Sequence, residues 1–255
     1  MRGGRRTACG GLVLLAACTL PPLRGVAEIG KDPYAVFVAK GTGGTDLYVA
    51  RSDAATVVPL TFTPVSEFGP VLSPDGGTVA FLRQPWPTDT AAVPSVWLVN
   101  LLSGAERELA LPRKVVERPQ RVGWSADGSV IFLQTDLAVW RFAAPPAEAV
   151  PGRVASADLA AADSAFMTLL GDPAFARAEP CEGAEPGICA VGREGRRTVI
   201  DREGGVPAAR WGPDSIAYVT SDGLEVRPLG PGRSRIVEWR PAPVELRELT
   251  FFPGR

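Results

Sequence analysis

The chain has 255 residues, of which 45% are apolar and 22% are charged, with a net charge of −1 and no histidine. This composition supports a folded core, and the length fits one large domain or two small ones. Because histidine is the usual general base and the commonest metal ligand, its absence disfavours Ser-His and Cys-His hydrolases and histidine metal sites.

The first 17 residues have the pattern of a secretory signal. Arg2, Arg5 and Arg6 form a positive start, and the apolar stretch Thr7 to Ala17 is too short to span a bilayer as a permanent helix. We therefore expect the chain to be exported and residues 1–17 to be removed. The mature chain would keep 24 basic and 28 acidic residues, a net charge of −4, which argues against nucleic acid as a partner.

The end of the apolar stretch, Leu15-Ala16-Ala17-Cys18, resembles the lipobox of bacterial lipoproteins. In that family cleavage precedes the cysteine, which then carries the lipid, so the resemblance implies membrane attachment through Cys18. Thr19 rather than aspartate follows, which in this family implies an outer-membrane lipoprotein that faces the periplasm. The alternative is cleavage after Gly25-Val26-Ala27, which would give a secreted or soluble periplasmic protein.

Cys181 and Cys189 remain once Cys9 leaves with the signal and Cys18 is acylated. In an oxidising compartment this spacing predicts a disulfide that closes a small loop. Further metal ligands are not obvious beside the pair. We therefore expect no metal and no cofactor.

After a linker at residues 18–31, a motif recurs through the predicted domain, residues 32–255. Aspartate, before glycine in two copies and before serine in the other two, lies in a tight turn, and β-branched or aromatic residues follow it, so each copy predicts a β-hairpin. The copies are Leu72-Ser73-Pro74-Asp75-Gly76, Trp124-Ser125-Ala126-Asp127-Gly128, Trp211-Gly212-Pro213-Asp214 and a worn copy at Ala161-Ala162-Asp163.

A third strand is predicted after each hairpin, and a shorter, more polar fourth strand follows most of them, as suits an outer edge. The second strands are predicted at 79–82, 130–133, 165–167 and 216–219. The third strands are predicted at 96–99, 137–140, 187–191 and 224–227, and the fourth at 106–109, 196–200 and 234–237. Four-stranded antiparallel units that recur about every 45 residues are typical of a β-propeller.

The hairpin motif resembles the PD40, or TolB-like, propeller repeat, which is WD40-like, and the copies at 72–76 and 124–128 are nearest to that pattern. The resemblance implies that Trp124 and Trp211 pack between blades. TolB has a separate α/β domain before its propeller, and the residues between Cys18 and Tyr34 are too few to hold one. The partners of TolB are therefore not implied for this chain.

The first unit lacks an inner strand, because residues 35–38, 46–50 and 57–61 match a second, third and fourth strand. Beyond the last fourth strand the chain continues through an apolar tail, Leu249-Thr250-Phe251-Phe252. With Gly254 in the aspartate column the period is about 45 residues. We therefore expect an all-β, five-bladed propeller closed by the C-terminal strand; a six-bladed or incomplete propeller is the alternative.

Asp158 and Glu248 are the only acids evident on the predicted inner strands. Glycosidases on this architecture need carboxylates that converge on the central channel, so we expect no enzymatic activity and name no catalytic residue. The alternative is a carbohydrate-active enzyme or a carbohydrate-binding propeller.

In a propeller, the loops between second and third strands share one face with the linkers between blades, and function often resides in such loops. Two of these loops are long, at 83–89 and 171–187. The predicted partner-binding site has Trp86 as its anchor and a basic rim of Arg113, Lys114, Arg118 and Arg121. The hypothesis is a monomeric, lipid-anchored binding or scaffold module for envelope proteins; the alternative is that the long loops are tolerated drift.

Overall fold

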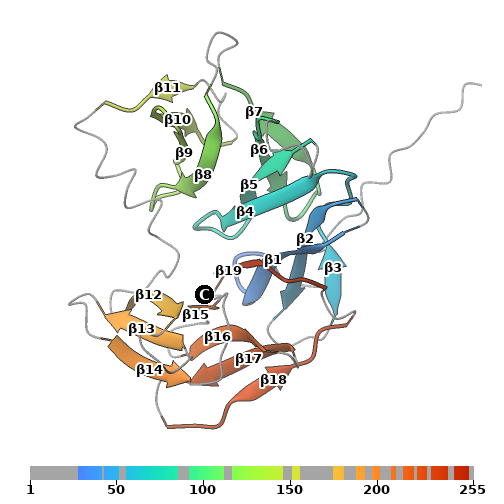
Figure 1. The fold of residues 1–255 in the computed structure, drawn as a ribbon, viewed down its shortest axis with the longest axis vertical. Helices are drawn as coiled ribbons and strands as arrows, with labels where there is room; N and C mark the ends of the chain where they lie inside the picture. Colours follow the sequence, from blue (N-terminus) through green and yellow to red (C-terminus); the bar gives the residue numbers. More distant parts are fainter. Residues whose placement is uncertain are drawn as a thin grey trace, which may run out of the picture.

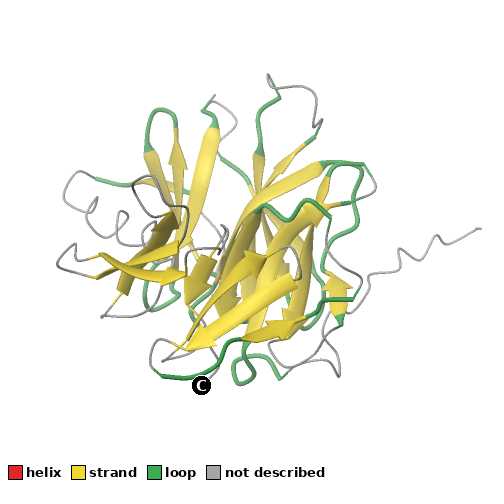
Figure 2. Ribbon diagram, turned by 60° about the horizontal axis from the view of Figure 1, so that its bottom comes forward, coloured by secondary structure: helices red, strands yellow, loops and turns green. Residues whose placement is uncertain are grey.

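The structure is a computed structural model that describes residues 28–41, 43–51, 56–85, 92–111, 117–145, 151–155, 175–180, 188–192, 197–201, 208–210, 215–220, 223–228, 231–240 and 244–252. Strands, turns and loops make up all of these segments (Figure 2). Within them, no helix is present that is long and apolar enough to cross a membrane.

The strands of the first three blades are β1 (Tyr34–Lys40), β2 (Thr45–Arg51), β3 (Val57–Pro59), β4 (Ser66–Leu72), β5 (Thr78–Gln84), β6 (Ser95–Asn100), β7 (Glu106–Leu109), β8 (Pro119–Trp124), β9 (Val130–Thr135), β10 (Val139–Ala143) and β11 (Gly152–Arg153). The remaining strands are β12 (Phe175–Pro180), β13 (Ile188–Gly192), β14 (Arg197–Asp201), β15 (Ala208–Arg210), β16 (Ser215–Thr220), β17 (Gly223–Pro228), β18 (Arg235–Val237) and β19 (Glu248–Phe252).

These strands form five antiparallel sheets, each of which we call a blade (Figure 1). Blade 1 has the order β19-β1-β2-β3, blade 2 is β4 to β7, blade 3 is β8 to β11, and blade 5 is β15 to β18. Blade 4 has three strands within the described residues, β12 to β14. The all-β prediction is confirmed, and the sheets are consistent with a five-bladed propeller.

The C-terminal strand supplies the inner strand of blade 1, as the tail predicted. In Figure 1, β19 (red) lies beside β1 (blue), and the pairing runs from Tyr34 opposite Phe252 to Val38 opposite Glu248. The rings of Tyr34 and Phe252 stack with their centroids 5.3 Å apart. The first blade is therefore assembled from the first and last strands of the fold.

Blade 4 corrects the sequence prediction. Residues 175–180, expected within a long loop at 171–187, form β12, which pairs with β13. The expected second strand at 165–167 lies outside the described residues. The error arose because the aspartate motif used to locate each hairpin is worn in this unit, so it did not mark the correct strand.

Blade 3 differs more modestly from its predicted strands. The third strand begins at Val139 rather than at Leu137. The Thr135 backbone N–H donates to the Ala138 carbonyl at 2.8 Å, so the residues between them form the turn.

Buried side chains join neighbouring blades in three of the clusters. Phe37 and Trp239 meet between blades 1 and 5, with ring centroids 4.4 Å apart. Tyr34 and Phe81 belong to the cluster between blades 1 and 2. Between blades 2 and 3, the indole N–H of Trp124 donates to the Val71 carbonyl at 3.1 Å, which confirms its position between blades; Trp211 lies outside the described residues.

The repeated motif proves to be a hydrogen-bonded turn. In blade 2, the hydroxyl of Ser73 donates to Asp75 (2.5 Å) and accepts the backbone N–H of Thr78 (2.9 Å). In blade 3, Ser125 makes the same two contacts with Asp127 (2.6 Å) and with the backbone N–H of Val130 (2.9 Å). The aspartate is therefore part of the turn, which accounts for its recurrence without any catalytic role.

Gly76 and Gly128 occupy the same place in these turns, with φ of 74° and 72°. A β-carbon on Gly76 would lie 2.4 Å from the Tyr34 hydroxyl and 2.7 Å from the Phe252 ring. A β-carbon on Gly128 would meet only the ring of Pro74, at 3.5 Å. The turn of blade 2 is thus packed against the paired ends of β1 and β19, whereas the turn of blade 3 has room.

This difference gives a matched pair of variants. Gly128→Ala should lower the unfolding free energy by about 1–2 kcal/mol, the cost of a β-carbon at positive φ. Gly76→Ala should cost about 1–3 kcal/mol more, because it also overpacks the contact with Tyr34 and Phe252. Urea denaturation of both variants measures the difference; equal losses would contradict the close packing of blade 2 against blade 1.

Candidate partner-binding face

The connections between strands lie at two opposite ends of the sheets, because successive strands alternate in direction (Figure 2). One end carries the turns β1–β2, β5–β6 and β9–β10 and the linkers between blades; we call it the linker face. The other end carries the Ser73–Thr78 and Ser125–Val130 turns and the β6–β7 turn; we call it the turn face.

Hydrogen bonds fix the linkers to the turns of the same face. The backbone N–H of Arg118, in the linker before β8, donates to the Asp136 carboxylate at 2.9 Å, and the Asp136 N–H returns a bond to the Arg118 carbonyl at 3.1 Å. The Lys40 N–H donates to the carbonyl of Val244, in the linker before β19, at 2.8 Å. Linkers and turns of the linker face are therefore joined by backbone hydrogen bonds.

Large apolar side chains are exposed on this face. The exposed fraction is 69% for Phe62 in the β3–β4 linker and 69% for Leu137 in the β9–β10 turn. Val93, before β6, and Val244 are also exposed. Among the other exposed large apolar residues that the structure describes, Leu102 lies on the turn face, and Val199 and Ile236 lie on the outer strands β14 and β18.

The structure places two of the five predicted binding residues. Arg118 lies on the linker face, and Arg121 follows on the inner strand β8, where its guanidinium donates to Gln134 of β9. Trp86, Arg113 and Lys114 lie outside the described residues. The predicted site with its basic rim therefore remains a prediction.

The predicted covalent sites are described only in part. Cys189 is buried on β13, opposite Val199 of β14. Cys18 and Cys181 lie outside the described residues. The lipid attachment and the pairing of Cys181 with Cys189 therefore also remain predictions.

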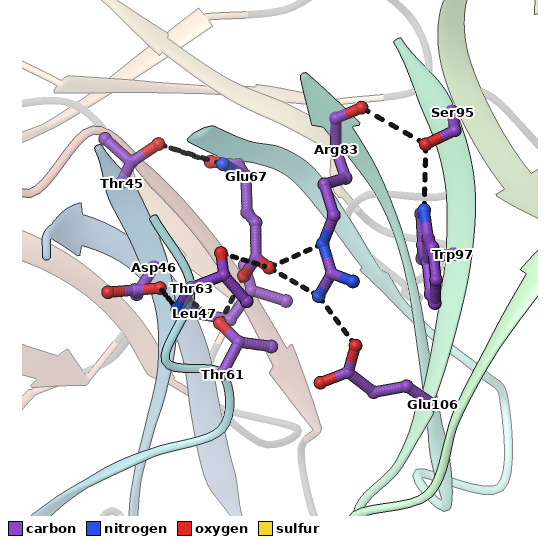
Figure 3. Close-up of polar contacts among 10 residues, drawn as sticks. All are labelled: Thr45, Asp46, Leu47, Thr61, Thr63, Glu67, Arg83, Ser95, Trp97 and Glu106. Atoms are coloured by element: carbon purple, nitrogen blue, oxygen red, sulfur yellow. Dashed lines mark hydrogen bonds and ion pairs between the residues drawn. The ribbon is translucent and has the colours of Figure 1, made fainter. Parts of the chain in front are cut away.

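A buried ionic cluster lies beneath the linker face, between blades 1 and 2 (Figure 3). Glu67 of β4 has a fully buried side chain, and its Oε1 accepts bonds from the Arg83 guanidinium at 2.9 and 2.6 Å. The same guanidinium binds Glu106 of β7 at 2.7 Å. The sequence motif marks only the end of this strand, at Leu72, so Glu67 was not predicted on it, and the prediction that Asp158 and Glu248 are the only evident inner-strand acids was wrong.

Arg83 is held over an aromatic surface as well as between two carboxylates. Its guanidinium carbon lies 4.3 Å from the centroid of Trp97, and its side chain is 12% exposed. Arg83 was predicted to lie in a loop, but β5 continues to Gln84. The apolar and aromatic neighbours require a delocalised cation that stacks, which favours arginine over lysine.

Blade 1 completes the cluster through its linker to blade 2. The hydroxyl of Thr61 donates to Glu67, and that of Thr63 donates to the same carboxylate at 3.3 Å. The Thr63 backbone N–H donates to the buried Asp46 carboxylate at 3.0 Å. The linker that carries the exposed Phe62 is thus held between two buried acids.

Blade 3 has a related cluster. The buried carboxylate of Glu117 accepts bonds from the Thr135 hydroxyl (2.6 Å), the Trp140 indole (2.7 Å) and the Arg153 guanidinium (2.9 Å). Burial raises the pKa of Glu117, but these three donors and the charge of Arg153 together bring it below its ordinary value. This carboxylate is therefore stabilised in its charged form.

The two clusters occupy equivalent positions in their blades. The third-strand tryptophans Trp97 and Trp140 lie opposite Phe81 and Leu133 on the second strands. Phe81 and Leu133 are equivalent positions, because each lies nine residues after the first residue of its hairpin motif, Leu72 or Trp124. Both blades thus bury a glutamate near the start of the inner strand and stack an arginine over the third-strand tryptophan. The arginine comes from β5 in blade 2 and from β11 in blade 3, so the two arginines do not occupy equivalent positions in the repeat.

The cluster between blades 1 and 2 yields a test. Arg83→Met keeps much of the side-chain volume over Trp97 but leaves the buried Glu67 carboxylate without its cation. We expect a loss of about 3–5 kcal/mol of unfolding free energy at pH 7, the usual cost of breaking a buried ion pair. Glu106→Gln is the control, since it removes the more exposed partner and should cost less than about 1 kcal/mol.

The loss in Arg83→Met should also depend on pH. Burial raises the pKa of Glu67 even beside Arg83, and removal of the cation raises it further, so the folded chain binds the proton more tightly than the unfolded chain. The added cost is absent below about pH 4 and grows as the pH rises through the folded pKa. Urea denaturation at pH 4 and pH 7 measures this, and an equal loss at both would contradict the ionic role.

The described residues hold no group of three or more His, Cys, Asp or Glu side chains that could bind a metal ion. No family model matches the chain. In sequence, the chain is similar to the "Protein TolB homolog" of Chlorobaculum tepidum, with 34% identity over 71 residues. That match covers 28% of this chain and 15% of the relative.

Two solved structures are similar over most of this chain. TolB from Acinetobacter baumannii is 14% identical with a TM-score of 0.38, over 87% of this chain and 55% of the other. Dipeptidyl peptidase 4 from Porphyromonas gingivalis is 12% identical with a TM-score of 0.37, over 74% of this chain and 36% of the other. The blades described above and the local sequence similarity to a TolB homologue together identify a TolB-like β-propeller fold.

Proposed function

We propose that this protein is an exported, lipid-anchored module of the bacterial cell envelope that binds another protein through its linker face. The observation that carries the proposal is the exposure of Phe62, Val93, Leu137 and Val244 at the same end of the sheets. Exposed apolar side chains on rigidly held loops are typical anchors of protein–protein contacts. The local similarity to a TolB homologue supports an address in the envelope.

The buried clusters explain why this face is suited to binding. Phe62 lies between Thr61 and Thr63, and both of these residues are hydrogen-bonded to buried carboxylates. Leu137 follows Asp136, which is bonded to the backbone of the neighbouring linker. A preorganised loop loses little conformational entropy on binding, so more of the contact energy contributes to affinity.

The described inner-strand carboxylates are engaged in structural contacts. Glu67 is buried and bound to Arg83 and Thr61, so it is not open to a substrate. Glu248 accepts the backbone N–H of Gly69 in the neighbouring blade. These contacts support a binding module over an enzyme.

The second candidate is a carbohydrate-active enzyme or a carbohydrate-binding propeller. It is favoured by Glu248 itself, because burial raises the pKa of this inner-strand carboxyl, as a general acid requires. Hydrolysis or binding of an envelope glycan that is lost in Glu248→Gln would establish this candidate.

Crosslinking in the native envelope tests the binding proposal. The double variant Phe62→Ser, Leu137→Ser should reduce the yield of a crosslinked protein partner at least about tenfold, since buried interface anchors contribute about 2 kcal/mol or more each. The matched control is Leu102→Ser, Ile236→Ser, which removes two exposed apolar side chains away from this face and should leave the yield unchanged. Equal yields from both double variants would overturn the proposal.

A further inference from the structure

We propose that the turn face is directed toward the membrane, so that the linker face is presented to partners on the side away from the lipid. This inference rests on the proposed lipid anchor at Cys18. It concerns a property that the anchor alone does not fix, namely which end of the blades the bilayer meets.

The chain enters the fold at the turn face. Ile29 packs on the apolar cluster between blades 1 and 2, and a β-carbon on Gly30 would lie 3.3 Å from the Asp75 carbonyl in the blade 2 hairpin turn. Asp32 forms an ion pair with Arg51, at the end of β2, at 3.4 Å. The segment from Glu28 to Asp32 also closes on itself, because the Lys31 and Asp32 N–H groups both donate to the Glu28 carbonyl at 3.0 Å. The entry point is therefore held in place.

The last strand ends at the same face, because Phe252 pairs with Tyr34 at the start of β1. Both described ends of the fold thus lie beside the hairpin turns, and the linker face lies one strand length away. A lipid attached just before the start of the fold, at Cys18, consequently keeps the turn face closer to the membrane than the linker face.

The length of the tether limits the alternative orientation. Nine residues lie between Cys18 and Glu28, so the ten residue-to-residue steps from Cys18 reach about 35 Å when fully extended. β1 has seven residues, so a blade is about 23 Å high. To place the linker face on the bilayer, the tether would have to run the height of a blade and use most of its reach, which costs chain entropy.

The charge of the turn face favours tethering over adsorption. Asp75 and Asp127 are exposed at the tips of their hairpins. Hydrogen bonds from Ser125 and Ser129 lower the pKa of Asp127 to about 2, so it stays ionised in any physiological medium. Anionic lipid repels these aspartates, which opposes the proposed orientation, so the lipid on Cys18 rather than adsorption of this surface has to hold the protein at the membrane.

This orientation defines the approach of a partner. A protein that binds Phe62 and Leu137 would arrive from the compartment beyond the bilayer surface and would not need to displace lipid. The exposed apolar side chains of the linker face would accordingly remain in water until a protein partner covers them.

Two exposed leucines on opposite faces allow a direct measurement. Leu102 lies in the β6–β7 turn on the turn face, and Leu137 lies in the β9–β10 turn on the linker face of the adjacent blade. A clickable amino acid in place of either leucine would carry a donor dye. The protein, residues 18–255, would be coupled to a lipid thioester through its N-terminal Cys18 and bound to phosphatidylethanolamine–phosphatidylglycerol vesicles with an acceptor dye in the headgroups.

We expect energy transfer from position 102 to be at least twofold more efficient than transfer from position 137. Equal efficiencies, or more efficient transfer from position 137, would overturn the orientation. Without the lipid, neither the protein with the dye at position 102 nor the one with the dye at position 137 should bind the vesicles. If the uncoupled protein binds and position 102 still gives the more efficient energy transfer, the tether does not orient the protein, and the inference fails.

The chemical anchor separates this inference from the proposed function. Acylation in cells is tested independently by metabolic labelling with a fatty acid, compared between the full chain and Cys18→Ser. Equal labelling of the two would refute the anchor in cells, whereas the vesicle measurement would still report how the fold sits on a tether at residue 18.

Discussion

Blade 1 has its inner strand only because the last strand of the fold returns to pair with the first. Val38 lies opposite Glu248 and Tyr34 lies opposite Phe252, so the inner strand of this blade comes from the far end of the chain. The Tyr34 and Phe252 rings then form the surface on which Gly76 of blade 2 is packed. The apolar cluster between blades 1 and 2 includes both rings, so loss of this pairing would open the contact between these blades.

The contact between blades 1 and 2 also contains the buried polar network that positions part of the linker face. Glu67, Arg83 and Glu106 of blade 2 meet Thr61 and Thr63 of blade 1 in a buried network. A buried ion pair adds little net stability by itself, but it fixes the register of the groups that it joins when each is satisfied. In this protein, the network positions the linker that carries the exposed Phe62. The contact between blades 1 and 2 therefore also shapes the surface proposed to bind a partner.

Local patterns in the sequence were sufficient to predict most of the strands. The Asp-Gly hairpins, the β-branched strands after them and the apolar tail located β4 to β9 and β15 to β19, because each depends on short-range turn chemistry and alternation. The prediction failed in blade 4, where the aspartate motif is worn and β12 was assigned to a loop. The strands were thus predicted correctly where the repeat motif is regular, and the prediction failed where the motif is worn.

The candidate site was less accessible to sequence reasoning. Glu67 and Arg83 lie 16 residues apart and Glu106 lies farther on, and their contact depends on strand registers and a bulge in β4 that no local pattern specifies. A glutamate near the start of an inner strand in both blade 2 and blade 3 was the available signal. It was obscured because the arginines that pair with Glu67 and Glu117 come from different strands.

The pairing of β19 with β1 is tested most directly by thermal unfolding of a variant that lacks residues 246–255. If the first blade requires this strand, the variant will lose the cooperative unfolding transition of the whole fold, since Leu249 and Phe252 are buried in the clusters on either side of blade 1. A variant that melts as cooperatively, and at the same temperature, as the intact protein would contradict the account.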